Sequence, residues 1–253
     1  MLSARDVSVI YANGVTALDS ASIDVGQGQF VVLLGKSGAG KSTLLRCFNG
    51  LVRPTSGDIH VEAFGSIFAS RSTLREHRRR TGMVFQQHHL IGRLSALENV
   101  LMGRLSRHGA FRTLLPFGKA DRLAALEVLD RVGLADRALT RADQLSGGQQ
   151  QRVGIARAMA QQPMLMLADE PVASLDPTTA VQVLGDLHRI CREDGITTIV
   201  SLHQLDLARR FADRIIGLAG GRVVFSAAPT ELASESIETI YSQPAVVFPV
   251  AAE

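Results

Sequence analysis

Short apolar runs alternate with stretches of helical periodicity along most of the chain. The clearest runs predict buried strands at Phe30–Leu34, Gly82–Phe85, Leu165–Ala168, Thr197–Leu202 and Ile215–Leu218. Two weaker runs, Val7–Tyr11 and Ala21–Val25, alternate apolar and polar residues as half-exposed antiparallel strands do. The pattern predicts an α/β fold in which helices cover a largely parallel sheet and an antiparallel element comes first.

Helical periodicity fills most of the intervals between these strands. The expected helices run from near Lys41 to Gly50, over Ala96–Leu105, over Lys119–Val132, and from Pro177 to Gly195. No strong strand is predicted between Gln86 and Gln162. We therefore expect one domain over residues 1–253, with a core at 1–86 and 163–242 and an inserted helical subdomain at 87–162. The apolar residues from Gln243 onward have no period and predict no element.

Composition excludes few classes of protein. Hydrophobic residues make up 46% and charged residues 20%, which is ordinary for a soluble α/β protein, and the net charge of +3 is too small to indicate a nucleic-acid partner. No apolar run approaches the roughly 18 residues that span a bilayer, and no secretory signal opens the chain. We expect a cytoplasmic chain in which Cys47 and Cys191 are buried and unpaired.

A glycine-rich loop follows the first strong strand and opens a helix. It comprises Gly35, Lys36, Ser37, Gly38, Ala39, Gly40, Lys41 and Ser42, with Thr43 next, and it matches the pattern GxxxxGK[ST]. Glycines let backbone N–H groups converge on phosphate oxygens at a helix N-terminus. Lys41 would reach the outer phosphates, and the Ser42 hydroxyl would bind Mg²⁺. The loop predicts a nucleoside triphosphate, and leaves kinases, GTPases and motors open.

Two adjacent carboxylates end another buried strand, Leu165–Ala168. Ligands in open α/β sheets lie beyond the carboxyl ends of the strands, so Asp169 and Glu170 are expected near the phosphates. Asp169 would hold Mg²⁺, directly or through water, and Glu170 would act as the general base toward the attacking water. A solvated acidic turn is the alternative for these two residues, and their pairing with the phosphate loop favours the catalytic role.

The run Leu145-Ser-Gly-Gly-Gln149, called the signature run below, precedes a helical stretch at Val153–Ala160. Its side chains and amides at Ser146, Gly147, Gly148 and Gln149 predict either a second anion cradle or an ordinary serine N-cap with a flexible turn. With this run the sequence resembles the nucleotide-binding subunits of ABC transporters. The resemblance covers nearly the whole chain, with the motifs of that family in order, and it implies a P-loop NTPase core of the RecA-like type.

The resemblance implies roles for further residues. Tyr11 resembles the aromatic residue that stacks on adenine, and Gln86 resembles the glutamine that contacts Mg²⁺ and the attacking water. Asp176, in Ser174-Leu-Asp176, belongs to a segment like the loop that signals between subunits, and His203 resembles the histidine that contacts the γ-phosphate. Each residue alone would suit an ordinary surface position.

The resemblance also implies a mechanism and partners. Two subunits would face each other head to tail, so that ATP at Lys41 of one is covered by Ser146 and Gly148 of the other. The homodimer would sit on integral membrane permease subunits at the cytoplasmic face of the inner membrane, and a periplasmic or extracellular solute-binding protein would act through the permease. The segment from His88 to Ser95 would dock on the permease. An arginine cluster at 71, 75, 78, 79 and 80 is expected to be a solvated helix face, with permease or lipid docking as the alternative.

Details favour an importer of the phosphonate type. The segments Gly92-Arg-Leu-Ser95, Asn99-Val-Leu-Met-Gly103 and Pro171-Val-Ala-Ser174 resemble the ATPases of phosphonate uptake systems. The predicted function is ATP-driven uptake of a small solute, phosphonate or a phosphate ester. Amino-acid import and lipoprotein release are the nearest alternatives, and a non-transport ABC protein acting on DNA or ribosomes is a more distant one. Only about a hundred residues separate the two glycine motifs, without the long coiled coil of the DNA-repair members.

Overall fold

The structure is a computed structural model of the chain that describes residues 2–87, 89–108, 116–232, 237–238 and 240. The chain forms two compact units, each described by itself. The first unit comprises Met1–His77 and Thr197–Glu253, and the second comprises Arg78–Ile196. The residues from Gln243 onward, for which no element was predicted, lie outside the described residues.

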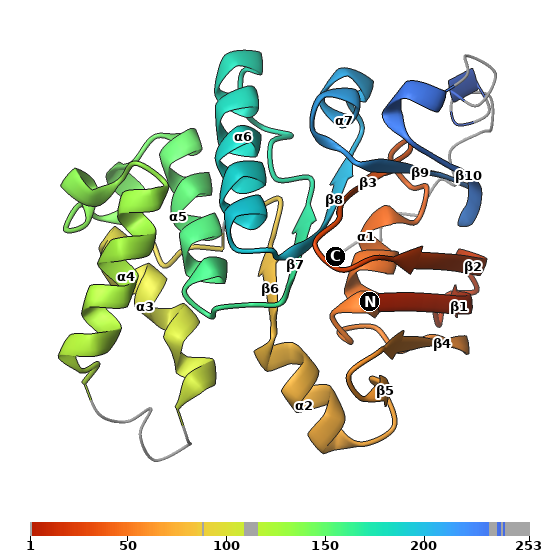
Figure 1. Cartoon of the computed structure of the whole chain (residues 1–253), viewed down its shortest axis with the longest axis horizontal. Helices are drawn as coiled ribbons and strands as arrows, with labels where there is room; N and C mark the ends of the chain where they lie inside the picture. Colours follow the sequence, from red (N-terminus) through yellow and green to blue (C-terminus); the bar gives the residue numbers. More distant parts are fainter. Residues whose placement is uncertain (1, 88, 109–115, 233–236, 239, 241–253) are drawn as a thin grey trace. The chain divides into compact units, whose positions relative to one another are not determined.

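An antiparallel sheet opens the first unit, with strands in the order β2-β1-β4-β5 (Figure 1). Its strands are β1 (Leu2–Ile10), β2 (Thr16–Val25), β4 (Ser56–Val61) and β5 (Gly65–Ser66). The sequence predicted the first two as shorter segments, because their alternation is interrupted by shifts in register along β1. The predicted antiparallel element is therefore present, and it is larger than the pattern indicated.

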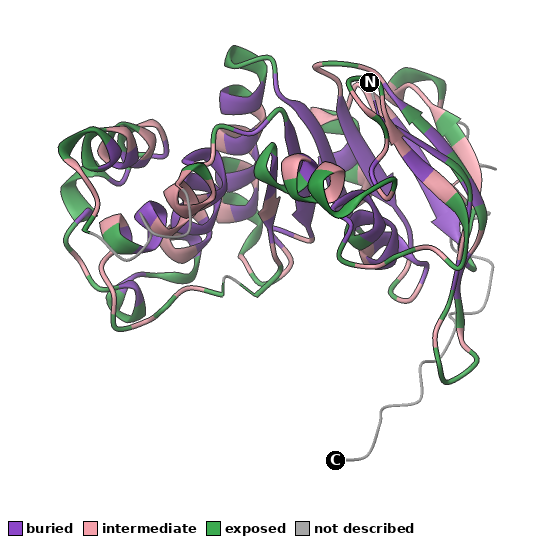
Figure 2. Ribbon diagram, turned by 90° about the horizontal axis from the view of Figure 1, so that it is seen from below, coloured by how far each residue is buried: buried purple, intermediate pink, exposed green. Residues whose placement is uncertain are grey.

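The parallel strands of the first unit carry its core. Strand β3 (Phe30–Leu34) lies between β8 (Thr197–Leu202) and β9 (Arg214–Ala219), and β10 (Arg222–Ala227) pairs antiparallel with β9. Every residue of β3 and β8 is buried, as expected for strands covered on both faces (Figure 2). The helices of this part are α1 (Lys41–Phe48) and α7 (Leu205–Phe211), with the turn η5 (Pro229–Glu231).

The second unit is mostly helical and contains one parallel pair of strands. Its elements are β6 (Thr81–Val84), α3 (Ala96–Arg104), η1 (Leu105–Arg107), α4 (Lys119–Arg131), η3 (Ala135–Arg137), η4 (Ala142–Gln144), α5 (Gly147–Met159), β7 (Leu165–Asp169) and α6 (Pro177–Glu193). Helix α2 (Arg71–Arg79) precedes β6. Strands β6 and β7 pair in parallel, with Val84 opposite Ala168. The division of the domain into a core and a subdomain at 87–162 stays a prediction.

All of the strong strands and four of the helices were predicted to within a few residues. Helix α1 ends before Gly50, and α6 ends before Gly195, and both glycines have positive φ (66° and 64°), which is the reason glycine stops a helix. Helix α7 and strands β4, β5 and β10 were not predicted, because they are short or polar. The arginine cluster expected on a solvated helix face lies on α2, apart from Arg80 just after it, and all five arginines are exposed. No helix among the described residues is long and apolar enough to cross a membrane.

Candidate functional site

The glycine-rich loop connects β3 to α1 in the first unit, as predicted. Lys41 is the first residue of α1 and is only 4% exposed. Its ammonium folds back over the loop and donates hydrogen bonds to the carbonyl oxygens of Gly35 (2.7 Å) and Lys36 (3.0 Å). A buried ammonium needs such partners, and here they hold the charge at the open end of the helix N-terminus.

Two glycines of this loop have no room for a side chain. A Cβ at Gly35 would lie 2.5 Å from the carbonyl oxygen of Leu218, and a Cβ at Gly40 would lie 2.5 Å from that of Ala17. Gly40 also has a φ of 99°, which only glycine adopts without strain. The loop thus approaches its neighbouring backbone closely, and this explains why the motif requires glycine there.

Two further predicted residues of the first unit lie beside this loop. The Tyr11 hydroxyl is 3.2 Å from the Thr43 hydroxyl oxygen, at hydrogen-bond distance, so the aromatic ring belongs to the surroundings of α1. Leu34 pairs with Leu202 in the sheet, and the residues that follow them are Gly35 and His203. His203 is exposed and leaves the sheet at the same edge as the phosphate loop.

The predicted acids and glutamine lie at one edge of the second unit. Because β6 and β7 are parallel and Val84 pairs with Ala168, Gln86 and Asp169 both come from the carboxyl edge of this strand pair. Asp169 is only 7% exposed, and Gln86 is exposed. Glu170 has a φ of 44°, an uncommon value for a non-glycine residue that is often found at functional sites.

The candidate metal ligands of the prediction are oxygen donors. Asp169 offers a carboxylate, Gln86 an amide oxygen, and Ser42, in the first unit, a hydroxyl at the start of α1. Hard oxygen donors with few carboxylates suit Mg²⁺, which keeps several waters and takes further oxygens from phosphates. The residues present therefore fit magnesium by their chemistry.

The signature run forms the N-terminus of α5 in the second unit. Ser146 is the N-cap, and it forms a capping box with Gln149: the backbone N–H of Ser146 donates to Gln149 Oε1 (3.0 Å), and the backbone N–H of Gln149 donates to Ser146 Oγ (3.4 Å). The predicted serine N-cap is present, but Gly147 and Gly148 belong to the first turn of α5 and do not form a flexible turn, and the anion cradle stays a prediction. Ser146 and Gly147 are exposed, whereas Gly148 is buried, so the start of α5 lies at the surface of this unit.

The segment Ser174–Asp176 lies against the signature run. A Cβ at Gly148 would be 2.5 Å from Thr179 Cγ2, and a Cβ at Gly147 would be 3.6 Å from Leu175. Asp176 is the N-cap of α6 and accepts a hydrogen bond from the backbone N–H of Thr179 (3.0 Å). Hydrogen bonds from the side chain and backbone of Thr179 lower the pKa of Asp176, which keeps this exposed carboxylate charged.

Three polar residues that organise this unit were not assigned a role from sequence. Asn99, on α3, is fully buried, and its side-chain oxygen accepts a hydrogen bond from the backbone N–H of Ile91 in the loop before that helix. The Gln150 side chain donates hydrogen bonds to the carbonyl oxygens of Ala142 and Leu145, and the Arg157 guanidinium donates one to the carbonyl oxygen of His89. The sequence offers one indication of the role of Asn99. Asparagine is unfavourable inside a helix, so an asparagine on a helix beside Val100 and Leu101 indicates that its side chain has a polar partner.

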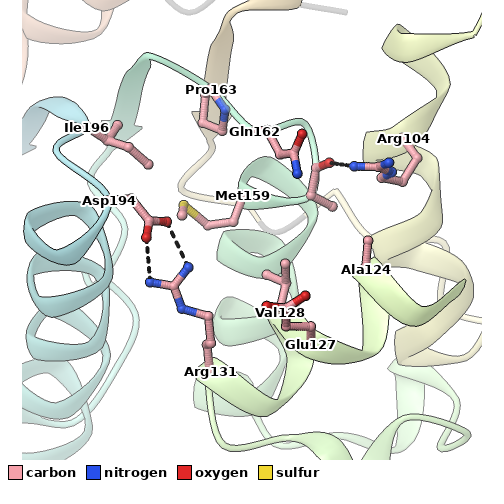
Figure 3. Close-up of a pocket in the computed structure, with 11 residues that line it drawn as sticks. Arg104, Ala124, Glu127, Val128, Arg131, Met159, Gln162, Pro163, Asp194 and Ile196 are labelled. Carbon is pink, nitrogen blue, oxygen red and sulfur yellow. Dashed lines mark hydrogen bonds and ion pairs between the residues drawn. The ribbon is translucent and has the colours of Figure 1, made fainter. Parts of the chain in front are cut away.

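Among the described residues of the second unit, two groups of side chains each line a cavity. The cavity of about 490 Å³ is lined by Met83, Phe85, His89, Met102, Gly103, Arg157, Ala158 and Gln161. The other, of about 280 Å³, lies near the amino end of β7, and its walls are tied by Arg131 to Asp194 and by Arg104 to the carbonyl oxygen of Ala160 (Figure 3). Asp169 ends the same strand at its opposite end, so this second cavity is separate from the predicted site.

Comparison with known proteins identifies the family. Residues 18–173 match the family model described as ABC transporter, a range that contains both glycine motifs and the acidic strand end. The chain belongs to the ABC transporter family. The fold prediction is thereby confirmed: an ABC ATPase cassette is an α/β P-loop NTPase.

Curated members of the ABC transporter family match almost the full chain. A phosphonates import ATP-binding protein of Cupriavidus metallidurans is 58% identical over 243 residues, covering 96% of this chain and 87% of that protein. A phosphite import ATP-binding protein of Stutzerimonas stutzeri is 62% identical over 236 residues, covering 93% of this chain and 85% of that protein.

A solved structure of an ABC cassette has the same fold. It is the dimeric post-hydrolysis state of an ATP-binding cassette bound to ADP and Pi, with a TM-score of 0.80 and 36% sequence identity. The match covers 90% of this chain and 99% of that one. The predicted resemblance to ABC subunits, and its narrower form toward phosphonate importers, agrees with these relatives.

Proposed function

We propose that this chain is the ATP-hydrolysing subunit of an importer for phosphonate or a closely related phosphorus oxyanion. The observation that carries the ATPase part is the phosphate loop, in which a buried lysine bonds two loop carbonyls at a helix N-terminus. A lysine is rarely buried unless its ammonium is paired, and here its partners belong to a loop whose motif is that of phosphate-binding loops. The names of the relatives support the solute class.

In this proposal the first unit binds the nucleotide. The loop from Gly35 to Thr43 surrounds the phosphates with backbone N–H groups, and Lys41 exchanges its carbonyl partners for phosphate oxygens. Tyr11 stacks on the adenine, which its hydrogen bond to Thr43 supports by fixing the ring beside α1. His203 contacts the γ-phosphate from the strand end next to the loop.

The second unit supplies the hydrolytic groups. Asp169 and Gln86 would hold Mg²⁺, with Ser42 of the first unit as a further candidate ligand, and the ion would neutralise the phosphate charge that develops during cleavage. Glu170 accepts a proton from the attacking water, and Gln86 orients that water. The shared carboxyl edge of β6 and β7 supports this assignment, because it places Gln86 and the two acids at neighbouring strand ends.

The active form in this proposal is a head-to-tail homodimer. The first turn of α5, with Ser146, Gly147, Gly148 and Gln149, covers the ATP held by the partner's phosphate loop. Asp176 lies beside this turn and signals between the two protomers. The dimeric ABC cassette structure of similar fold supports this assembly.

Permease subunits dock on the second unit, on the cytoplasmic face of the inner membrane. The predicted docking segment includes His88, which lies outside the described residues; His89 lines the cavity of about 490 Å³. Apolar side chains of Met83, Phe85 and Met102 form much of that cavity, which suits a helix of a membrane protein. A solute-binding protein acts through the permease, and no nucleic acid takes part.

The test is growth on a defined phosphorus source. A strain that lacks this chain should grow normally on phosphate and fail on methylphosphonate or on phosphite as sole phosphorus source. The wild-type chain should restore growth and the Lys41→Ala variant should not. The two sources separate the phosphonate assignment from a phosphite assignment, and normal growth of the deletion strain on both would refute the solute class. Purified chain that hydrolyses no ATP would refute the enzymatic part.

A further inference from the structure

The docking segment, taken here as its described residues 89–95, is hydrogen-bonded to the residues that lead into the signature run. Backbone N–H groups of Ala96 and Leu97 donate to the carbonyl oxygens of Thr140 (2.9 Å) and Ala138 (2.9 Å). In the opposite direction, the backbone N–H of Ala142 donates to the carbonyl oxygen of Leu94 (2.9 Å), and the backbone N–H of Asp143 donates to the carbonyl oxygen of Gly92 (3.1 Å).

These bonds form a short antiparallel ladder, which also contains a β-bridge between Ser95 and Arg141. One side of the ladder continues from the docking segment, and the other side, residues 138–143, reaches Ser146 through η4. The ladder therefore connects the docking segment to the N-terminus of α5 without a flexible linker.

Asn99 fixes the shape of the docking segment. The side chain is fully buried, and its Oδ1 accepts a hydrogen bond from the Ile91 N–H (2.9 Å). Its Nδ2 donates to the carbonyl oxygens of Ile91 (3.2 Å), Leu94 (3.4 Å) and Ser95 (3.0 Å). One amide side chain thus lies within hydrogen-bond distance of four backbone groups of the segment, of which the carbonyl oxygens of Leu94 and Ser95 also accept backbone hydrogen bonds from Ala142 and Asn99.

Helix α5 binds both ends of this arrangement. Near its N-terminus, the Gln150 side-chain amide donates to the carbonyl oxygens of Ala142 (3.0 Å) and Leu145 (3.1 Å). Two turns further along, the Arg157 guanidinium donates to the carbonyl oxygen of His89 (2.7 Å). The docking segment is therefore tied to the signature helix directly at one end and through the ladder at the other.

We propose that residues 89–97, residues 138–143 and the N-terminal turn of α5 move as one rigid piece, with Asn99 and Gln150 as positioning residues for the signature run. A push on the docking segment then displaces the signature turn by the same movement. The inference rests on the proposed function, since it names how permease docking reaches the turn that covers the partner's ATP. Neither residue touches nucleotide in this scheme.

A disulfide across the ladder tests rigidity directly. A Cβ built at Gly92 lies 3.3 Å from Asp143 Cβ, near the separation of about 3.5–4.5 Å that a disulfide requires. The double variant Gly92→Cys/Asp143→Cys should therefore crosslink on oxidation, while the native Cys47 and Cys191 are buried. If the ladder stays intact through the cycle, the oxidised protein should hydrolyse ATP within about twofold of its reduced form.

Asn99→Leu loosens the ladder without placing a charge in the core. It should raise the KM for ATP about tenfold, because the signature turn no longer holds its place over the partner's nucleotide. The Kd for ATP of dilute, monomeric protein should stay within about twofold, since the phosphate loop is unchanged. Oxidising the Gly92/Asp143 cysteine pair in the Asn99→Leu background should restore most of the KM, and reduction should remove the rescue.

The matched control is Asp121→Asn, which weakens a buried bond from Arg104 at the other end of α3 (3.0 Å) and leaves the ladder untouched. It should lower stability and leave the KM for ATP unchanged. Amide hydrogen exchange of Gly147–Gln150 without nucleotide should speed up in Asn99→Leu, return to the wild-type rate in the oxidised triple variant, and stay at that rate in the control.

Three results would overturn the inference. The first is an unchanged KM together with unchanged exchange in Asn99→Leu, and the second is the same KM increase in the Asp121→Asn control. The third is loss of ATP hydrolysis when the cysteine pair is oxidised in the otherwise wild-type chain, with hydrolysis recovering on reduction. The last result would show that the two segments separate during turnover. Absence of hydrolysis in the wild-type chain would instead refute the proposed function, and the exchange measurement would still decide the inference.

Discussion

Replacing Gly40 by alanine perturbs the phosphate loop in two ways that the structure separates. The φ of 99° places a side chain in a region that costs an L-residue about 1–2 kcal/mol. The new Cβ would also lie 2.5 Å from the carbonyl oxygen of Ala17 and 2.9 Å from Leu18 Cδ2, closer than the 3.0 Å that real Cβ atoms keep. Relieving such overpacking costs about 1–3 kcal/mol. The sum is about 2–5 kcal/mol.

A second glycine isolates the steric part of this cost. Gly65, the first residue of β5 in the same unit, has a φ of 73° and nothing within 4 Å of a built Cβ. Gly65→Ala should therefore lose only about 1–2 kcal/mol from backbone strain. The entropic benefit of alanine in the unfolded chain is the same in both variants, so it cancels in the comparison.

Thermal unfolding measures the difference. At about 2–4 °C per kcal/mol for a chain of this size, Gly40→Ala should lower Tm by about 5–20 °C, and Gly65→Ala by about 2–8 °C. ATP should raise the Tm of Gly65→Ala as much as that of wild type, and raise the Tm of Gly40→Ala less, because the displaced loop no longer fits phosphate. Equal losses of Tm in the two variants would refute the steric argument, and an equal rise with ATP would refute the phosphate assignment.

Three further substitutions address charge and catalysis. Lys41→Ala should weaken ATP binding at least about 100-fold in a direct titration, and unchanged affinity would contradict the role of this ammonium. Glu170→Gln should keep ATP binding and slow hydrolysis about 100-fold or more, trapping a closed dimer visible by size-exclusion chromatography with ATP; normal turnover would remove Glu170 from the general-base role. Burial raises the pKa of Asp121, but hydrogen bonds from Arg104 and His108 outweigh burial, so the net pKa lies below the ordinary value of 3.8. The charged carboxylate therefore stabilises the folded chain fully above pH 3.8. This contribution is lost as the pH falls through the lower pKa of the folded state. Asp121→Asn should lower the free energy of unfolding by about 2 kcal/mol at neutral pH, and Tm should then fall less steeply as the pH becomes acidic. The same acid dependence of Tm in the variant and the wild type would refute this linkage.

Elements with a strong local pattern were predictable because burial and capping follow from adjacent residues. Strand β3 is apolar at every position, and α1 and α6 begin and end at residues whose side chains or φ values set the boundary. The phosphate loop was predictable for the same reason: Gly40 and Lys41 act through backbone geometry that lies within a few residues.

The residues that sequence did not assign act across distance along the chain. Asn99 is important because α3 packs so that its amide meets the loop at Ile91, and Gln150 is important because residues 138–143 return beside that loop. Strand β10 is partly exposed and bounded by a glycine turn, so its pairing with β9 leaves no clear alternation in the sequence. Tertiary pairing of this kind has no local period to detect.

The division of the chain into two units gives the proposed chemistry two separable parts. Lys41 and Tyr11 belong to the first unit, whereas Asp169, Glu170 and the signature run belong to the second. Substitutions of Lys41 or Tyr11 should therefore change ATP affinity in dilute monomer, and substitutions of Glu170 or of the signature run should change turnover while leaving that affinity intact. Lys41→Ala and Glu170→Gln are the extreme cases, and Asn99→Leu should behave like the second class although it lies outside the predicted site. A single affinity titration thus separates variants that impair nucleotide binding from variants that impair the later steps of the cycle.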